Sequence, residues 1–204
     1  MHYKEKLEYN ENGTIMLTEK NNIFSEAELQ KLEGLVDELP FEHVEIGDAD
    51  EPNLLEVGRL ITDVEKPKLV NKSITSQVLD IVASKKSFQF YSYLLEKSEL
   101  YIRRMQYNVL GQGCFVGLHL DTDSNPDYIV AVVIQLGGDF KGGNYVVYGG
   151  GKPPRSFSPT RFSTIFSDCR YEHEVTKVKS GFRKSLVFFL SSNNGKNSRN
   201  RESQ

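Results

Sequence analysis

Several features are scarce in this 204-residue sequence. It has only two cysteines, Cys114 and Cys169, and neither belongs to a Cys-x-x-Cys motif, so structural zinc and dithiol redox chemistry have no support. No apolar run is long enough to cross a membrane. The polar start, MHYKEKLEYNENG, lacks the apolar stretch of a signal peptide. We therefore expect a cytoplasmic protein with reduced, mostly buried thiols.

Basic residues are not in excess either. The chain has 25 Lys and Arg against 28 Asp and Glu, for a net charge of −3. Proteins that hold a phosphate backbone concentrate positive charge, so nucleic acid is not an expected partner. The hydrophobic share of 38% at this length fits one compact domain. Nothing in the composition predicts an oligomeric state.

The first half of the chain has a helical texture. Ser25 and Glu28 form a capping box, and Pro40 ends the pattern that follows. The residues that repeat at helical spacing between them are Leu29, Leu32, Leu35, Val36 and Leu39. A second helical stretch is predicted within 73–97. Residues 43–72 are poorly patterned, and we expect loops and short strands there.

From about residue 100 the texture becomes that of a β protein. Short β-rich runs such as YIVAVVIQL and SLVFFL alternate with glycine- and proline-rich turns, which is typical of a sandwich or barrel. We expect an α+β, mostly β fold: a jelly roll, or double-stranded β-helix, flanked by N-terminal helices. The predicted domain is 1–190, with a helical or mixed flank (1–99) and a jelly-roll core (100–190). The hydrophilic end, 191–204, is predicted to be a disordered tail.

Two histidines and an aspartate have the pattern of a metal site. His119 and Asp121 are two residues apart, so on a strand they would share a face. His173 follows in a second β-rich segment, YEHEVTKV. Two histidines and one carboxylate that leave positions open are the ligands of non-haem Fe(II) oxygenases. Each residue alone would more often be structural, so the argument depends on the set.

Arg183 and Ser185 strengthen this interpretation. They also lie two apart, in the apolar segment GFRKSLVFFL, which should be buried. A buried arginine needs an anionic partner. The planar guanidinium suits bidentate binding of a carboxylate, and a hydroxyl adds one more hydrogen bond.

Residues 107–190 resemble the Fe(II)/2-oxoglutarate dioxygenases, and within them the prolyl 4-hydroxylase-like group. The matching elements come in the family's order. They are Tyr107, Gly111 and Phe115 before the His119–Asp121 pair, then DFKGGNYVVY, then FSTIFSDCRYEHEV, then the spacing from His173 to Gly181 and Arg183. The first 100 residues contain no motif that matches.

The resemblance implies the cofactors and their ligands. Fe(II) would be held by His119, Asp121 and His173. The co-substrate 2-oxoglutarate would chelate the iron, and its far carboxylate would pair with Arg183, aided by Ser185 and the Tyr107 hydroxyl. Molecular oxygen is the oxidant, and ascorbate is left open as a further cofactor. The presence of Asp121 implies hydroxylation rather than halogenation, because related halogenases lack this carboxylate.

The substrate is not named by any motif. Arg103, Arg104, Asn144 and Arg161 are candidate substrate contacts. The first hypothesis is hydroxylation of a prolyl or other peptide side chain. An alternative is hydroxylation of a free amino acid or other small metabolite, and a third is a non-catalytic, cupin-like binding protein. A long open groove would favour a peptide, and a closed pocket with an extra charged clamp would favour a small molecule.

Overall fold

The computed structural model describes residues 13–46, 53–149 and 151–201. Among these residues the helices are α1 (Glu26–Asp37), α2 (Lys72–Val82) and α3 (Lys85–Leu95). The strands are β1 (Thr14–Leu17), β2 (Phe41–Ile46), β3 (Asn53–Asp63), β4 (Pro67–Leu69), β5 (Tyr101–Leu110), β6 (Val116–His119), β7 (Val130–Leu136), β8 (Phe140–Gly142), β9 (Tyr145–Gly149), β10 (Lys152–Phe157), β11 (Thr164–Asp168), β12 (His173–Val175), β13 (Val178–Gly181) and β14 (Arg183–Ser191).

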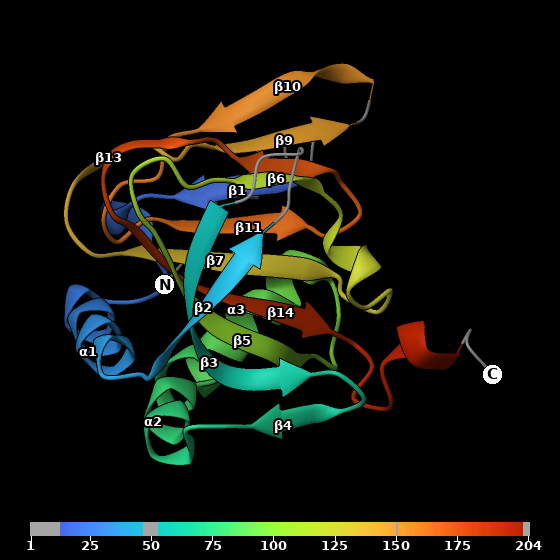
Figure 1. The fold of residues 1–204 in the computed structure, drawn as a ribbon. Helices are drawn as coiled ribbons and strands as arrows, with labels where there is room; N and C mark the ends of the chain where they lie inside the picture. The colour runs from blue at the N-terminus through green and yellow to red at the C-terminus, as the bar shows by residue number, and fades with distance from the viewer. Residues whose placement is uncertain (1–12, 47–52, 150, 202–204) are drawn as a thin grey trace.

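The strands form two main antiparallel sheets (Figure 1). The larger sheet has the order β1-β11-β7-β14-β5-β3-β2, with β4 paired to β3. The smaller sheet has the order β10-β9-β12-β6, and β13 pairs with β8 beside it. Apart from the consecutive pairs β2-β3, β3-β4 and β9-β10, neighbours in the two sheets are distant in sequence, as in a jelly roll. The expected double-stranded β-helix with flanking helices is confirmed.

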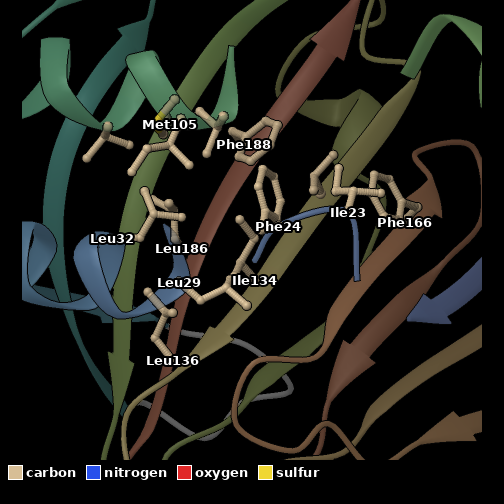
Figure 2. Close-up of a cluster of buried hydrophobic side chains, with 14 of the residues drawn as sticks. Ile23, Phe24, Leu29, Leu32, Met105, Ile134, Leu136, Phe166, Leu186 and Phe188 are labelled. Atoms are coloured by element: carbon tan, nitrogen blue, oxygen red, sulfur yellow. The ribbon is translucent and has the colours of Figure 1, made fainter. Parts of the chain in front are cut away.

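The helices cover one face of the larger sheet (Figures 1 and 2). Helix α1 begins at Ser25, whose side chain accepts from the backbone N–H of Glu28 while Glu28 reaches back, so the predicted capping box is confirmed. Leu29 and Leu32 of α1 are fully buried against Ile134 and Leu186 of the sheet. Burial of each such leucine contributes about 2 kcal/mol. Among the described residues, no helix is long and apolar enough to span a membrane.

Strand β7, at the centre of the larger sheet, is buried on both faces. All its residues, VAVVIQL, are buried. Ile134 and Leu136 pack under the helices, whereas Val133 belongs to a second apolar cluster between the sheets. The space between the two sheets is therefore an interior. The candidate site lies there.

The N-terminal half contributes more strand than the sequence predicted. Residues 53–63 form the 11-residue strand β3, where loops and short strands were expected. Its long register with β5 places it inside the larger sheet, and β1 pairs with β11. The stretch 73–97 is divided into two helices, because Ser84 caps the start of α3. The boundary at residue 100 therefore does not separate the sheet from its flank.

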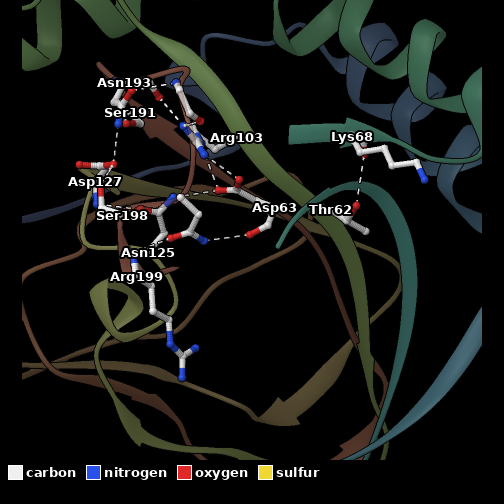
Figure 3. A network of polar contacts seen from close by, with 12 residues as sticks. Thr62, Asp63, Lys68, Arg103, Asn125, Asp127, Ser191, Asn193, Ser198 and Arg199 are labelled. Carbon is white, nitrogen blue, oxygen red and sulfur yellow. Dashed lines mark hydrogen bonds and ion pairs between the residues drawn. The ribbon is translucent and has the colours of Figure 1, made fainter. Parts of the chain in front are cut away.

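The expected disordered tail is also corrected, as far as Arg201. Arg103 donates through Nη1 to the carbonyls of Asn193 (2.8 Å) and Gly195 (3.0 Å) (Figure 3). Asn197 is 3% exposed and donates to the backbone of Asp63. The segment contains no apolar anchor, but these hydrogen bonds to buried groups hold it against the sheet.

Candidate metal centre and co-substrate site

The smaller sheet brings the two predicted histidines together. His119 ends β6 and His173 begins β12, and the two residues are direct cross-strand partners. The spacing suggested that Asp121 would lie on the same strand as His119. It is instead the first residue of a 3-10 turn (Asp121–Asp123). The turn still directs its carboxylate toward the histidines. The three predicted side chains therefore point to one centre from the end of β6, the start of β12 and the 3-10 turn.

The distances suit one metal ion. Nε2 of His119 lies 3.6 Å from Oδ1 of Asp121, and Nε2 of His173 lies 3.5 Å from Oδ2. All three ligand atoms lie within 4.8 Å of one another. Adjacent ligands of an octahedral ion with bonds of about 2.1 Å are roughly 3 Å apart, so only small movements separate this arrangement from a bound one.

Backbone carbonyls orient both imidazoles. Nδ1 of His119 lies 2.8 Å from the carbonyl of Gly117, and Nδ1 of His173 lies 3.1 Å from that of Tyr171. Because a carbonyl only accepts, each Nδ1 carries the proton and each Nε2 presents its lone pair to the centre. Burial lowers the pKa of His173, which favours the neutral form that binds a metal.

Asp121 is buried, and its Oδ2 has no hydrogen-bond partner among the described residues. The Cys169 thiol lies nearby, and burial together with the Asp121 charge raises the pKa of Cys169. A buried carboxylate oxygen without a donor is unfavourable unless a cation occupies the site. The donor set therefore fits a divalent metal ion such as Fe(II).

A cavity of about 230 Å³ extends from the triad between the two sheets. Most of its wall is apolar. The apolar wall residues are Leu55, Leu110, Val116, Ala131, Val133, Val175, Val187 and Phe189.

Arg183 lines the same cavity and is 3% exposed. Its Nη1 donates to Oγ of Ser185 (3.2 Å), whereas Nε and Nη2 have no partner among the described residues. Burial lowers the pKa of this guanidinium to about 10. Two unpaired buried N–H groups on one side of a cation form the fork that binds a carboxylate. The predicted pair of Arg183 and Ser185 thus fits the far carboxylate of 2-oxoglutarate.

Tyr145 is a cavity residue that the sequence analysis missed. Its ring stacks on His173, with centroids 5.1 Å apart, and its hydroxyl has no hydrogen-bond partner among the described residues. Burial and the nearby Asp121 charge raise its pKa, so it remains a neutral donor. The signal was its position directly after the GGN turn, at the start of a strand.

Gly143 makes room for the arginine. Its φ is +60°, and a Cβ there would lie 2.9 Å from Cδ of Arg183. Gly143→Ala should therefore displace the guanidinium and raise the KM for 2-oxoglutarate, and the unfavourable φ should lower the free energy of unfolding by about 1–2 kcal/mol. Gly151→Ala is the matched control, because its φ is +68° with nothing within 4 Å. Steady-state kinetics and urea unfolding of both variants test this; an equal change in KM would contradict it.

Tyr107 does not reach the cavity, which corrects the prediction for this residue. It is paired in register with Leu186 and shares the helix-covered face of the larger sheet. Its hydroxyl donates to Oδ1 of Asp37 at 2.9 Å. Strand alternation explains the error, because Arg183 and Leu186 are three residues apart and face opposite sides.

The candidate substrate contacts are also separated by the fold. Arg104 lines the cavity. Arg103 is fully buried in an ion pair with Asp63. Asn144 bonds to Ser156, Ser158 and Thr176 rather than lining the cavity, and Arg161 pairs with Glu33 of α1 at 2.6 Å. Among the four, only Arg104 is placed to meet a substrate.

Comparisons with known proteins agree with this geometry. Residues 105–191 match the 2OG-Fe(II) oxygenase superfamily. No curated protein matches the chain. A crystal structure of an oxidoreductase of the 2OG-Fe(II) oxygenase family from Burkholderia pseudomallei is 38% identical, with 95% of this chain and 92% of that chain covered and a TM-score of 0.90.

More distant structures share the fold. A prolyl hydroxylase from Trichoplax adhaerens, in complex with a hypoxia-inducible factor peptide fragment, is 12% identical (TM-score 0.65; 98% and 91% covered). A Pseudomonas putida prolyl-4-hydroxylase is 14% identical (TM-score 0.62; 92% and 97% covered). The 38% identity to the Burkholderia protein over almost the whole of both chains, with which the His119–Asp121–His173 triad agrees, shows that the chain belongs to the 2OG-Fe(II) oxygenase family.

Proposed function

We propose that the protein hydroxylates a C–H bond of a small organic substrate, with Fe(II) held by His119, Asp121 and His173. The observation that carries the proposal is Arg183, a buried cation with unpaired N–H groups in the same cavity as the triad. In a jelly roll that only bound a metal, this buried guanidinium would have no anionic partner. A co-substrate that chelates the metal and ends in a carboxylate would supply that partner.

Bound Fe(II) and 2-oxoglutarate supply the oxidative chemistry, in which one O2 converts 2-oxoglutarate to succinate and CO2 and a substrate C–H to C–OH. The chain's own residues bind and orient. His119, Asp121 and His173 would hold the metal with three ligands, which would leave further positions for 2-oxoglutarate and O2. Arg183, Ser185 and Tyr145 would hold the far carboxylate, and the apolar wall residues would limit the access of bulk water to the reacting atoms.

Two substrate classes were expected, a peptide side chain and a small metabolite. The second is favoured by the small cavity volume of about 230 Å³, which is below the usual size of drug-sized ligand sites. It is also favoured by Arg104, which adds a charged group to the wall. The prolyl hydroxylases among the structural neighbours share the fold at 12–14% identity, and this says nothing of the substrate.

The test of cofactor use does not require the substrate. Anaerobic addition of Fe(II) and 2-oxoglutarate should produce the weak visible charge-transfer band of an iron-bound keto acid. Zn(II) in place of Fe(II) should give no band, because its d shell is full and it has no redox chemistry. Succinate in place of 2-oxoglutarate should give none, because it has no keto group. Absence of the band with both true partners present would contradict the proposal.

A further inference from the structure

Arg104 is presented to the cavity by a hydrogen-bonded row of side chains on β5. Residues 104, 106 and 108 are spaced two apart, so they lie on the same face of the strand, and all three line the cavity. Nε and Nη2 of Arg104 donate to Oε1 of Gln106 at 3.1 and 2.8 Å. Nε2 of Gln106 in turn donates to Oδ1 of Asn108 at 2.7 Å. One edge of the guanidinium is thus held in place by Gln106.

The charge of Arg104 has no carboxylate partner in the part of the chain that the structure describes. Its neighbour Arg103 points to the other face and is neutralised by Asp63 at 2.7 Å. The Arg104 guanidinium instead lies 6.0 Å from the ring centroid of Phe189, and its Nη1 makes no hydrogen bond to a described residue. A half-buried cation that is fixed on one side and unpaired on the other is arranged to receive an anion.

Arg104 and Arg183 extend into the cavity from separate positions on the larger sheet. Arg183 is paired in register with Leu110, and Arg104 lies six residues before Leu110 on the same strand face. Six residues of strand span about 20 Å. 2-Oxoglutarate that chelates the metal through its keto acid end has one further carboxylate, which the proposed function assigns to Arg183, so Arg104 is left without an anion from the co-substrate.

The Asp121 ligand lies toward the Arg104 end of the cavity. Cys169, which neighbours the Asp121 carboxylate, packs in one cluster with Phe189 and Ala131. Phe189 is also the ring beneath Arg104. Arg104 is therefore close to the metal ligands, while both it and Arg183 line the same cavity from separate positions on the larger sheet.

We propose that Arg104 binds the carboxylate of the primary substrate, and that this substrate is a small carboxylic acid such as a free amino acid. The inference rests on the proposed function, since it assigns Arg183 to 2-oxoglutarate and the metal to Fe(II). Gln106 acts as a positioning residue for the guanidinium. A carboxylate held by Arg104 would place the rest of a small substrate beside the metal ligands, where a C–H bond could be oxidised.

The experiment compares acids with their uncharged counterparts. Each of the proteinogenic amino acids is supplied as the free acid and as the carboxamide, together with acetyl-proline-amide and a capped peptide that contains Asp and Glu. Two readouts are taken: succinate formation from 2-oxoglutarate, and the perturbation of the anaerobic Fe(II)–2-oxoglutarate band, which reports binding without turnover. Wild type is compared with Arg104→Gln, Arg104→Lys and the control Arg161→Gln, whose side chain pairs with Glu33 outside the cavity.

We expect at least one free acid to stimulate succinate formation and to perturb the band, and its carboxamide to do neither. Arg104→Gln should lower kcat/KM for that acid by roughly 30-fold or more, since the loss leaves a desolvated anion unpaired. Arg104→Lys should recover part of this, and Arg161→Gln should match wild type. The unperturbed Fe(II)–2-oxoglutarate band and the unfolding midpoint should be the same in all four proteins.

Stimulation by none of the acids, or equal stimulation by acid and carboxamide, would overturn the inference. So would a response to acetyl-proline-amide that is unaffected by Arg104→Gln. An Arg104-dependent response limited to the acidic peptide would overturn the small-molecule assignment, because the anion would then come from a protein side chain. If wild type gave no charge-transfer band at all, the proposed function itself would fail, and this result is distinct from all the others.

Discussion

Arg183→Ala should raise the KM for 2-oxoglutarate by roughly two orders of magnitude or more. Loss of one partner of a buried charge pair costs about 3–5 kcal/mol, and each 1.4 kcal/mol is a factor of about ten. The affinity for Fe(II) should change little, because Arg183 is not one of the clustered metal ligands. Steady-state kinetics with varied 2-oxoglutarate, and metal titration under anaerobic conditions, measure the two quantities.

Removal of the Arg183 charge should not destabilise the free protein. Without 2-oxoglutarate, Arg183 is a buried cation with two unpaired N–H groups, and this arrangement destabilises the fold. Arg183→Met, which keeps the apolar stem, should therefore leave the free energy of unfolding unchanged or raise it. The affinity of this variant for 2-oxoglutarate should fall.

Two controls belong to this prediction. Arg183→Lys should give an intermediate KM, because a cation remains but the bidentate fork is lost. Arg161→Ala should leave the KM unchanged, because its partner is Glu33 on α1. A KM for 2-oxoglutarate that is the same in Arg183→Ala and wild type would refute the co-substrate site.

Arg103→Leu should lower the free energy of unfolding by about 3–5 kcal/mol, because it leaves a buried carboxylate unpaired. The side chains of Arg103 and Asp63 are both 0% exposed and are joined by hydrogen bonds of 2.7 and 3.1 Å (Figure 3). Arg103 also holds the carbonyls of Asn193 and Gly195. Urea unfolding of the purified protein measures the loss.

The network around Asp63 also reaches the metal-ligand turn. Asp63 accepts from Nδ2 of Asn125 at 2.9 Å and from the Tyr128 hydroxyl at 3.1 Å, and both residues follow Asp121 in the chain. Arg103→Leu should therefore also weaken metal binding.

A surface ion pair provides the contrast for Arg103. Arg59→Ala removes a pair with Glu42 whose side chains are 33% and 63% exposed, so it should lower the free energy of unfolding by about 0–1 kcal/mol. The double change Arg103→Leu with Asp63→Leu should recover part of the loss, since no charge is then left buried. Equal losses in Arg103→Leu and Arg59→Ala would show that the buried network does not contribute as proposed.

The sequence by itself determined the chemistry of the metal centre. His119, Asp121 and His173 were identifiable because few residue types bind such metals and because their order matches a known family. Arg183 was identifiable because a charge in an apolar strand demands a partner. Helix α1 was equally predictable, since its capping box and apolar spacing are local signals.

Only the tertiary structure decided which side of a strand meets the cavity. Tyr107 faces the helices and Tyr145 faces the metal ligands because of register with partner strands, which no local pattern encodes. For the same reason the two adjacent arginines have different roles. Arg103 forms a buried ion pair with Asp63, whereas Arg104 lines the cavity. The order of residues 191–201 likewise depends on hydrogen bonds to groups 90 residues distant, such as Arg103. Such pairings form only when the fold brings the partners together, so composition alone predicted disorder there.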